Sequence, residues 1–268
     1  MARFSIFGAS GFIGSHLTAG LKRAGHDVLA IGRDDFPPSG QSLGHVIYCI
    51  GLTANFRNQL ESTVRAHVCV LLDVLASYTF ESFLYLSSTR IYADATETRE
   101  ETPLLVRPKL ADHVYNLSKL TGEALCLAQP QPSTRVVRIS SVIGPGDPPI
   151  NFLPSVVYEA RRKREVVMHT SEESSKDYID IDDVCRLLER IALQGKSRLY
   201  NVASGVNVSN KTIAGLVAHS LAAKVTFSDE APRIVFPAID TSRICDEFNF
   251  SAIPFAKSFE RLVKEDHG

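Results

Sequence analysis

The first half of the chain alternates short apolar runs with stretches in which apolar residues recur every three or four positions. Polar residues do not alternate with the apolar ones inside the short runs, which is typical of strands buried on both faces of a sheet. These runs lie at Arg3–Phe7, Asp27–Ile31, His45–Cys49, Ser82–Ser87 and Arg135–Ile139. Helical patterns between them cover about residues 13–24, 59–77 and 112–128. This order predicts an α/β fold with a doubly wound parallel sheet.

The pattern becomes less regular after the proline- and glycine-rich segment 144–149. Further elements are predicted as a helix near 152–163, a strand near 165–168, a helix near 181–193 and a strand at 198–202. We expect residues 1–145 to form a nucleotide-binding domain and residues 146–268 to form mostly a smaller substrate-binding lobe. Segments near 176–203 are expected to return to the first domain, so that the two are interleaved.

A glycine-rich turn follows the first predicted strand directly. Gly8, Gly11 and Gly14 have the spacing of a dinucleotide-binding turn, in which they permit a tight turn, backbone approach to a pyrophosphate and close packing of helix on strand. The N-terminus of the following helix would bind the pyrophosphate with its unpaired N–H groups. Three glycines at this spacing also close ordinary strand–helix turns, but the strand before and the helix after favour the cofactor. The residues expected at the cofactor are Gly8, Ser10, Gly11, Phe12, Ile13 and Gly14.

Composition narrows the function classes. The chain has 268 residues and a formal net charge of −1, without blocks of like charge, which makes nucleic acid and anionic membranes poor candidates for partners. Five cysteines are scattered without a C-x-x-C pair, which indicates reduced thiols, and the histidines show no metal-binding spacing. No apolar run is long enough to span a bilayer, and Met1 leads directly into a strand. We therefore expect a cytoplasmic protein with neither a metal nor a membrane segment.

Tyr115 and Lys119 lie four residues apart in a predicted helix, so their side chains share one face. A phenol titrates near about 10, and a fixed positive charge beside it favours the phenolate. Such a pair can move a proton to or from a substrate hydroxyl while a nicotinamide moves hydride. The alternative is that Tyr115 is only an amphipathic helix residue.

Hydroxyl groups end the apolar strand before this helix, in the run Ser87-Ser88-Thr89. Ligands of open α/β sheets bind at the carboxyl edge, where these side chains would lie. A hydroxyl at this edge can hold the reacting oxygen of the substrate beside the Tyr115 phenol. The alternative is that Ser and Thr only cap the structure that follows.

Together these motifs resemble the extended short-chain dehydrogenase/reductase family of nucleotide-sugar epimerases, dehydratases and ketoreductases. The resemblance covers nearly the whole chain and includes the glycine turn, Leu86–Tyr92, Tyr115-x-x-x-Lys119, Arg138–Gly146, Lys176–Val184 and Tyr200–Gly205. It implies a Rossmann-type sheet, NAD(P) and a nucleotide-sugar substrate. It further implies that Tyr115 transfers the proton, Lys119 binds the nicotinamide ribose and tunes Tyr115, and Ser88 hydrogen-bonds the substrate. Cys49 and Gly51 would pass near the cofactor.

The resemblance also implies where the substrate binds. Thr89 and Arg90 would lie beside Ser88. Ser141 stands where the family carries a substrate-contacting Asn, and Arg233 is the first choice for a partner of the diphosphate, with a solvated surface role as the alternative. His67 replaces an Asn common in the family, and we expect it to have a core or water-bridging role. A homodimer built by pairing helices 59–77 and 112–128 is a further expectation from the family.

The end of the second strand bears on the choice between NADP and NAD. NAD-dependent proteins place an acidic residue there for the adenosine ribose, whereas this chain has Gly32 followed by Arg33. A guanidinium can clamp a 2′-phosphate, so the sequence favours NADP through Arg33. Asp34 or Asp35 would serve the ribose of NAD if the strand ran further.

NADPH in turn favours a reductase acting on a keto-sugar nucleotide, with a 4-keto-6-deoxy sugar as the expected substrate. The alternative is a nucleotide-sugar 4-epimerase that holds NAD tightly. Dehydration is disfavoured because Thr89 and Arg90 stand where dehydratases carry Asp-Glu. A second alternative is a non-catalytic regulator that senses nicotinamide, although such proteins usually lose the Tyr-x-x-x-Lys pair.

Overall fold

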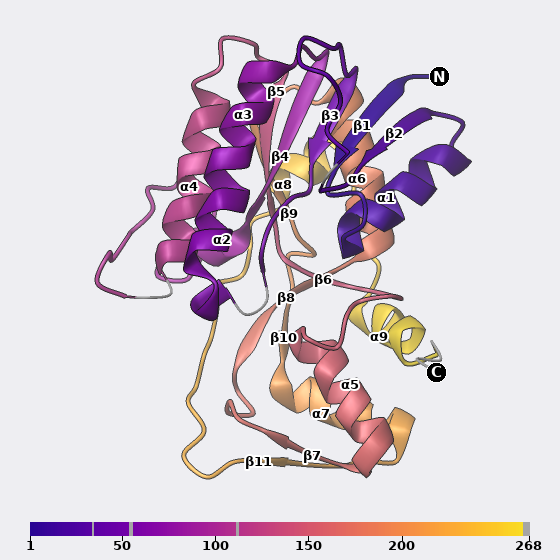
Figure 1. The fold of residues 1–268 in the computed structure, drawn as a ribbon. Helices are drawn as coiled ribbons and strands as arrows, with labels where there is room; N and C mark the ends of the chain where they lie inside the picture. Colours follow the sequence, from indigo (N-terminus) through magenta and orange to yellow (C-terminus); the bar gives the residue numbers. More distant parts are fainter. Residues whose placement is uncertain (34, 54–55, 111–112, 265–268) are drawn as a thin grey trace.

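A six-stranded sheet with strand order β2-β1-β3-β4-β5-β9 organises the upper part of the molecule (Figure 1). All neighbouring strands run parallel, which confirms the predicted Rossmann-type sheet. The computed structural model describes all residues except 34, 54–55, 111–112 and 265–268. The strands are β1 (Arg3–Phe7), β2 (Asp27–Ile31), β3 (His45–Tyr48), β4 (Ser82–Ser88), β5 (Thr134–Ile139) and β9 (Leu199–Val202).

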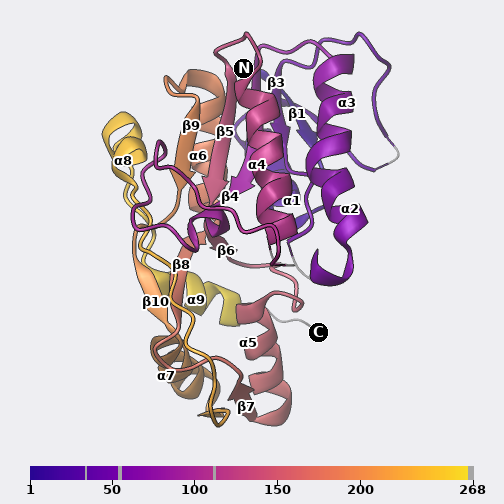
Figure 2. The same cartoon turned by 90° about the vertical axis from the view of Figure 1, so that its left-hand side faces the viewer.

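Helices cover both faces of this sheet (Figures 1 and 2). One face carries α1 (Phe12–Arg23) and α6 (Ile181–Gln194), and the other carries α2 (Leu60–Val64), α3 (Val70–Ser77) and α4 (His113–Leu127). Ile6 packs in the core under α1 and α6, whereas its neighbour Phe7 packs in the core under α3 and α4. Burial on both sides is the physical reason why the strand sequences are apolar without alternation.

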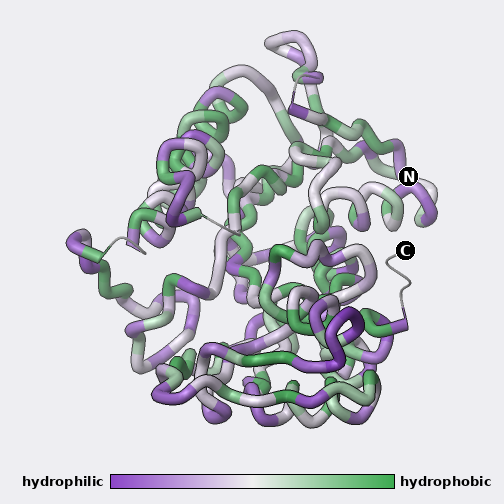
Figure 3. The backbone as a smooth tube through the Cα atoms, turned by 60° about the horizontal axis from the view of Figure 1, so that its bottom comes forward, coloured by the Kyte–Doolittle hydropathy of each residue, from purple (hydrophilic) through white to green (hydrophobic). Residues whose placement is uncertain are grey.

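The lower lobe contains a three-stranded sheet of order β10-β8-β6 and a two-stranded sheet of β11 and β7. It has its own hydrophobic core, and within single helices the chain changes between hydrophobic and hydrophilic residues, as one buried face requires (Figure 3). The division at residue 145 stays a prediction. The remaining elements are β6 (Ser141–Ile143), α5 (Phe152–Lys163), β7 (Glu165–Met168), β8 (Ser175–Asp180), β10 (Asn207–Ser209), α7 (Asn210–Leu221), β11 (Lys224–Phe227), α8 (Ser242–Phe248) and α9 (Phe255–Lys264).

The predicted helix 59–77 is not continuous. A π-helical turn at Arg65–Cys69 separates α2 from α3, and its extra residue turns His67 into the interior. The other predicted elements agree with the structure to within a residue at most ends, although residue 112, at the start of the predicted helix 112–128, lies outside the described residues. Within the described ranges, no helix combines the length and the apolar character that crossing a bilayer requires.

Candidate active site

The glycine turn connects β1 to α1 at the carboxyl edge of the sheet. A Cβ at Gly14 would collide with the Gly8 carbonyl, and one at Gly8 would lie 3.0 Å from the Ile50 nitrogen. Gly8 also has a positive φ of 78°, a conformation that other residues rarely adopt. The first N–H groups of α1, which belong to Phe12 and Ile13, have no partner within the helix. The turn therefore fits a dinucleotide, because it offers bare backbone and unpaired donors to a pyrophosphate.

Strand order reverses between β1 and β3, so the crevice at their carboxyl ends is the topological switch point of the sheet. Cys49 and Gly51 follow β3 at this crevice, and the Cys49 N–H donates to the Phe7 carbonyl at 2.9 Å. A Cβ at Gly51 would lie 3.4 Å from Lys119 Nζ, so the bare backbone there lets the chain pass close to this ammonium. These two predicted cofactor residues thus lie beside the predicted catalytic helix.

Ser88, Tyr115 and Lys119 come together above this crevice. Ser88 ends β4 near the Tyr115 phenol on α4, and its hydroxyl favours the ionised form of that phenol. Lys119 lies one turn further along α4, where Nζ donates to the Leu86 carbonyl at 2.7 Å. Both Tyr115 and Lys119 are almost fully buried. Hence the structure brings the three predicted catalytic residues into one cluster.

Burial dominates the electrostatics of the cluster. It raises the pKa of Tyr115, while the nearby Ser88 hydroxyl and the charge of Arg90 oppose that rise. Burial also lowers the pKa of Lys119 to about 7, against the opposing influence of Glu123 and Cys49. The Tyr115 phenol is therefore protonated at neutral pH. An anion close to Lys119 would raise the pKa of Lys119 and so stabilise its charged form.

A buried polar network supports the cluster from behind. Arg138 Nη2 on β5 lies 2.7 Å from Glu123 Oε2 on α4, and both side chains are almost fully buried. Ser87, next to Ser88, donates to Glu123 Oε1 at 2.5 Å. Arg138 also donates to the Tyr92 hydroxyl at 2.6 Å. These contacts tie α4 to the ends of β4 and β5, which fixes the helix that carries Tyr115.

The lower lobe contributes a basic group, Lys176, on which the charge of Arg90 acts. Lys176 on β8 lies over the rings of Phe152 and Tyr178, with Nζ 5.5 Å and 5.0 Å from the ring centroids. Burial and the positive charge of Arg90 lower the pKa of Lys176 to about 8, while Asp147 opposes them. The positive charge of Arg90 therefore lowers the pKa of both Tyr115 in the upper lobe and Lys176 in the lower lobe. The resemblance implied that the segment containing Lys176 binds the nucleotide diphosphate half of the substrate, but it singled out no role for Lys176 itself.

The remaining predicted substrate residues lie at different distances from this centre. Thr89 follows Ser88, and its hydroxyl points to the Ile139 carbonyl at 3.5 Å. Ser141 begins β6, where it pairs with Tyr178 of β8. Arg233 is exposed in the segment before α8, and its charge acts on the exposed Glu173. Thr89 and Ser141 thus lie just beyond the carboxyl ends of β4 and β5, whereas the structure gives Arg233 a setting at the surface.

A carboxylate occupies the end of β2. Asp35 Oδ2 lies 2.7 Å from the position that a Cβ at Gly32 would take. The carboxylate therefore stands close to where the side chain of an acidic residue at position 32 would begin. Arg33 adjoins it, and Asp34 lies outside the described residues.

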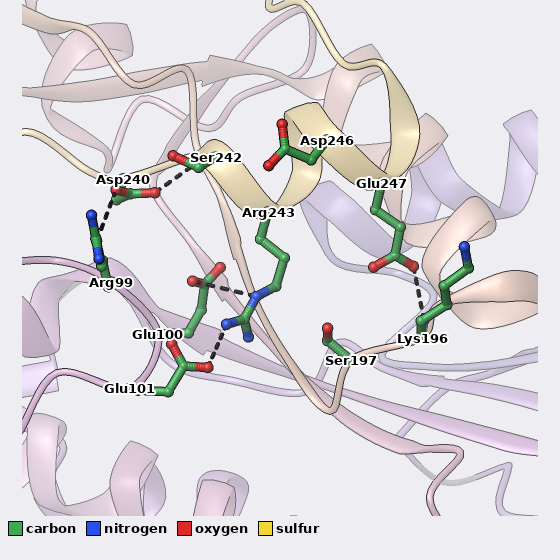
Figure 4. Close-up of a pocket in the computed structure, with 10 residues that line it drawn as sticks. All are labelled: Arg99, Glu100, Glu101, Lys196, Ser197, Asp240, Ser242, Arg243, Asp246 and Glu247. Carbon is green, nitrogen blue, oxygen red and sulfur yellow. Dashed lines mark hydrogen bonds and ion pairs between the residues drawn. The ribbon is translucent and has the colours of Figure 1, made fainter.

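An open, charged pocket of about 620 Å³ lies elsewhere, between the loop around Glu100 and helix α8 (Figure 4). Arg243 pairs there with Glu100 at 3.6 Å and with Glu101, and Arg99 lies 3.8 Å from Asp240. Its walls contain none of the predicted site residues described above. Among the described residues, no group of three or more His, Cys, Asp or Glu side chains is arranged to hold a metal.

Comparison with known proteins agrees with this geometry. A dTDP-4-dehydro-6-deoxy-D-allose reductase of Streptomyces sp is 24% identical over 97% of this chain and 94% of its own length. The structure of MoeE5 in complex with UDP-glucose and NAD has a TM-score of 0.82, at 22% identity and with 98% and 97% of the two chains covered. The structure of RMD from Pseudomonas aeruginosa with NADPH has a TM-score of 0.79 at 22% identity, covering 98% of each chain.

The family model of the NAD dependent epimerase/dehydratase family matches residues 5–203. This segment contains the glycine turn, Ser88, Tyr115 and Lys119, which the fold assembles around the switch-point crevice. The chain therefore belongs to the NAD dependent epimerase/dehydratase family and is a nicotinamide-dependent enzyme of the short-chain dehydrogenase/reductase type.

Proposed function

We propose that this enzyme uses NADPH to reduce the keto group of a nucleotide-activated sugar, a 4-keto-6-deoxy sugar in the first instance. The observation that carries the proposal is the cluster of Tyr115 and Lys119, both almost fully buried on α4, with the Ser88 hydroxyl at the end of β4. Similarity over nearly the full length to a dTDP-4-dehydro-6-deoxy-D-allose reductase supports the reaction type.

The protonation state of the Tyr115 phenol favours reduction of a substrate carbonyl. A reduced nicotinamide, when bound, would supply hydride chemistry at the carbonyl carbon, and the carbonyl oxygen would need a proton. Because burial raises the pKa of Tyr115, the phenol keeps its proton at neutral pH and can donate it to that oxygen. Ser88 orients the same oxygen by a hydrogen bond, while the positive charges of Lys119 and Arg90 stabilise the phenolate that remains.

Arg90 and Lys176 are the proposed partners of the substrate diphosphate. They belong to opposite lobes, and burial together with the charge of Arg90 lowers the pKa of Lys176. A diphosphate between them would offset the repulsion of their charges, so the site gains from binding a doubly charged anion. Arg233 stays a prediction from the sequence, and its exposed setting beside Glu173 makes Lys176 the stronger choice.

Arg33 and Asp35 decide the cofactor. Arg33 would clamp the 2′-phosphate of NADPH, whereas Asp35 stands where it can accept hydrogen bonds from an unphosphorylated ribose. Under the proposal, Arg33→Ala weakens NADPH binding at least tenfold more than NADH binding, and Asp35→Ala strengthens NADPH binding. Titration of each variant with both cofactors, followed by nicotinamide fluorescence, measures this. Equal losses for both cofactors in Arg33→Ala would overturn the assignment of NADPH.

The position of Asp35 also favours the second candidate, a 4-epimerase that keeps NAD bound. The two candidates separate in one experiment. The purified protein is incubated with NADPH and a panel of nucleotide-activated keto-sugars, and absorbance of the reduced nicotinamide is followed. Stoichiometric oxidation supports the reductase, interconversion of sugars without net oxidation supports the epimerase, and binding without turnover supports a nicotinamide sensor.

Tyr115→Phe tests the proton donor itself. The variant keeps the ring and loses only the hydroxyl, so we expect it to fold and bind cofactor while turnover falls by about 10²-fold or more. Retention of wild-type turnover would remove Tyr115 from the chemistry.

We also propose that the enzyme forms a homodimer through helices α2, α3 and α4. Leu60, Val64, Leu72 and Leu117 expose 37–50% of their surface on these helices, an apolar face that a second copy would bury. Light scattering tests the dimer: Leu72→Glu should give a monomer at concentrations where the wild type is dimeric, and a monomeric wild type would exclude it.

A further inference from the structure

His67 is a fully buried polar residue for which the proposed reaction has no role. It lies in the π-helical turn between α2 and α3, where the extra residue of the turn directs its imidazole toward α4. The ring meets the Tyr115 ring edge to face, with centroids 5.3 Å apart and an interplanar angle of 84°. Because buried polar groups are nearly always hydrogen-bonded, both ring nitrogens of this imidazole are expected to have partners.

The hydrogen bonds of His67 define its tautomer. The Leu52 N–H donates to Nε2 at 3.3 Å, so Nε2 must be the unprotonated nitrogen. On the other side, Nδ1 lies 2.8 Å from Ser118 Oγ, and that hydroxyl donates its own proton to the Tyr115 carbonyl at 2.8 Å. Ser118 can therefore only accept from His67, which places the proton on Nδ1. The two sides give the same answer: a neutral imidazole protonated at Nδ1.

The surroundings keep this tautomer neutral. Burial and the positive charge of Lys119 lower the pKa of His67 to about 2. Three phenols lie close by, Tyr115 on α4, Tyr85 on β4 and Tyr48 on β3, and the Cys49 thiol follows β3 directly. The Tyr85 hydroxyl donates to the His67 carbonyl at 3.3 Å, and that of Tyr48 to the Ala66 carbonyl at 2.7 Å. Burial raises the pKa of all four, so none of them supplies a negative charge at neutral pH.

His67 thus joins two parts of the active site. Through Ser118 it holds the first turns of α4, which carry Tyr115 and Lys119. Through the Leu52 N–H it holds the stretch after β3, where Gly51 would run beside the cofactor. A Cβ at Gly51 would lie 3.3 Å from His67 Nε2 and 3.4 Å from Lys119 Nζ, so the imidazole and the ammonium border the same piece of backbone.

We infer that His67 is a positioning residue whose Nδ1-protonated imidazole sets the place of Tyr115 against the cofactor-side backbone at Gly51 and Leu52. It touches neither the substrate nor the reacting atoms in this role. The inference deepens the proposed function and rests on Tyr115 being the proton donor. Its tests include two readouts, tautomer and cofactor affinity, that do not depend on which sugar is reduced.

The tautomer is measured directly. In a spectrum that correlates the imidazole nitrogens of the ¹⁵N-labelled protein with their carbon-bound protons, His67 is assigned by the signal lost in His67→Asn. We expect the pattern of the neutral Nδ1–H form, unchanged from pH 5.5 to pH 9. An imidazolium, or the Nε2–H tautomer, would contradict the hydrogen-bond assignment and with it the inference.

Two substitutions of His67 separate its hydrogen bond with Ser118 from its hydrogen bond with Leu52. Asn places an amide where Nδ1 lies and keeps the link to Ser118, but it is too short to reach Leu52. Gln places its carbonyl near Nε2 and keeps the link to Leu52, but it loses Ser118. A neutral hydrogen bond corresponds to about a fivefold effect. We therefore expect His67→Asn to weaken cofactor binding about fivefold with the pH profile of kcat/KM unchanged. In His67→Gln we expect near-normal cofactor binding, a lower kcat and a shifted basic limb of that profile.

Ser118→Ala supplies a second route that leaves His67 intact. It removes the Nδ1 partner, so it should reproduce the shifted profile of His67→Gln, and the double variant should show no further shift. His45→Asn is the matched control, because His45 Nδ1 also bonds a serine, Ser82, at 2.9 Å, but at the opposite end of β3. A purely structural role for His67 would lower the melting temperature of all variants while cofactor affinity and pH profile stayed as in the wild type. That outcome would overturn the inference, whereas absence of turnover in the wild type with every sugar would instead reject the proposed function.

Discussion

Replacing Lys119 by Met should stabilise the cofactor-free enzyme near neutral pH while abolishing its use of the cofactor. Lys119 is almost fully buried, and burial lowers its pKa from 10.5 to about 7. The folded state therefore binds this proton more weakly than the unfolded chain does. Between about pH 7 and 10.5 the unfolded state carries more protons, so stability rises with pH in this window and the full cost applies below it.

The magnitude follows from the shift. Each pKa unit corresponds to about 1.4 kcal/mol, so the lysine costs the folded state up to about 5 kcal/mol below pH 7. Met fills a similar volume without a charge, but it loses the hydrogen bond from Nζ to the Leu86 carbonyl, worth about 1 kcal/mol or more. The net expectation at pH 7 is a gain in the free energy of unfolding of about 2–3 kcal/mol. The gain should shrink by about 1 kcal/mol per pH unit above pH 7.5.

Urea unfolding followed by circular dichroism at pH 6.5, 7.5, 8.5 and 9.5 measures this difference. Taking the difference between variant and wild type cancels the titration of the other buried groups, provided that the m-values agree. Lys22→Met on the exposed surface of α1 is the control and should leave the pH dependence unchanged. If Lys119→Met were less stable than the wild type at every pH, or if the difference did not vary with pH, the burial argument would be refuted.

Two further substitutions test the packing behind the site. Gly122→Ala should destabilise the protein by about 1–3 kcal/mol, because the added Cβ would collide with the Tyr85 phenol, whereas Gly20→Ala in α1 has open space and should stabilise it by about 0.5–1 kcal/mol. Glu123→Gln should cost about 3–5 kcal/mol, since it leaves the buried Arg138 without a counter-charge, while Glu260→Gln in an exposed pair should leave the urea midpoint nearly unchanged. Urea midpoints measure all four, and equal effects for either matched pair would contradict the role of burial.

The first β-α unit was predictable because its signals are local. The apolar run of β1, the glycine turn and the helix follow one another within 21 residues, and the structure agrees with the prediction to within one residue. The same holds for the pairing of Tyr115 with Lys119, because helical spacing alone puts both side chains on one face. Local pattern is sufficient where neighbours in the chain are also neighbours in space.

The lower lobe shows the opposite case. Strands β10 and β11 have three and four residues and depend on pairing with β8 and β7, about 30 and 60 residues earlier in the chain. Segments this short have little periodicity of their own, so the sequence did not predict them. The π-helical turn was not predicted for a related reason. It contains one residue more than a regular helical turn, and this changes the periodicity of the apolar positions very little.

The sequence by itself determined the parallel sheet, the glycine turn and the residues suited to proton transfer, because these depend on periodicity and on side-chain chemistry. Only the tertiary structure decided that the charge of Arg90 acts on Lys176, that Asp35 folds back over Gly32 and that His67 links Ser118 to Leu52. Each of these contacts involves either two distant segments or the path of a loop. Such contacts form only when the whole chain packs, and no local pattern encodes them.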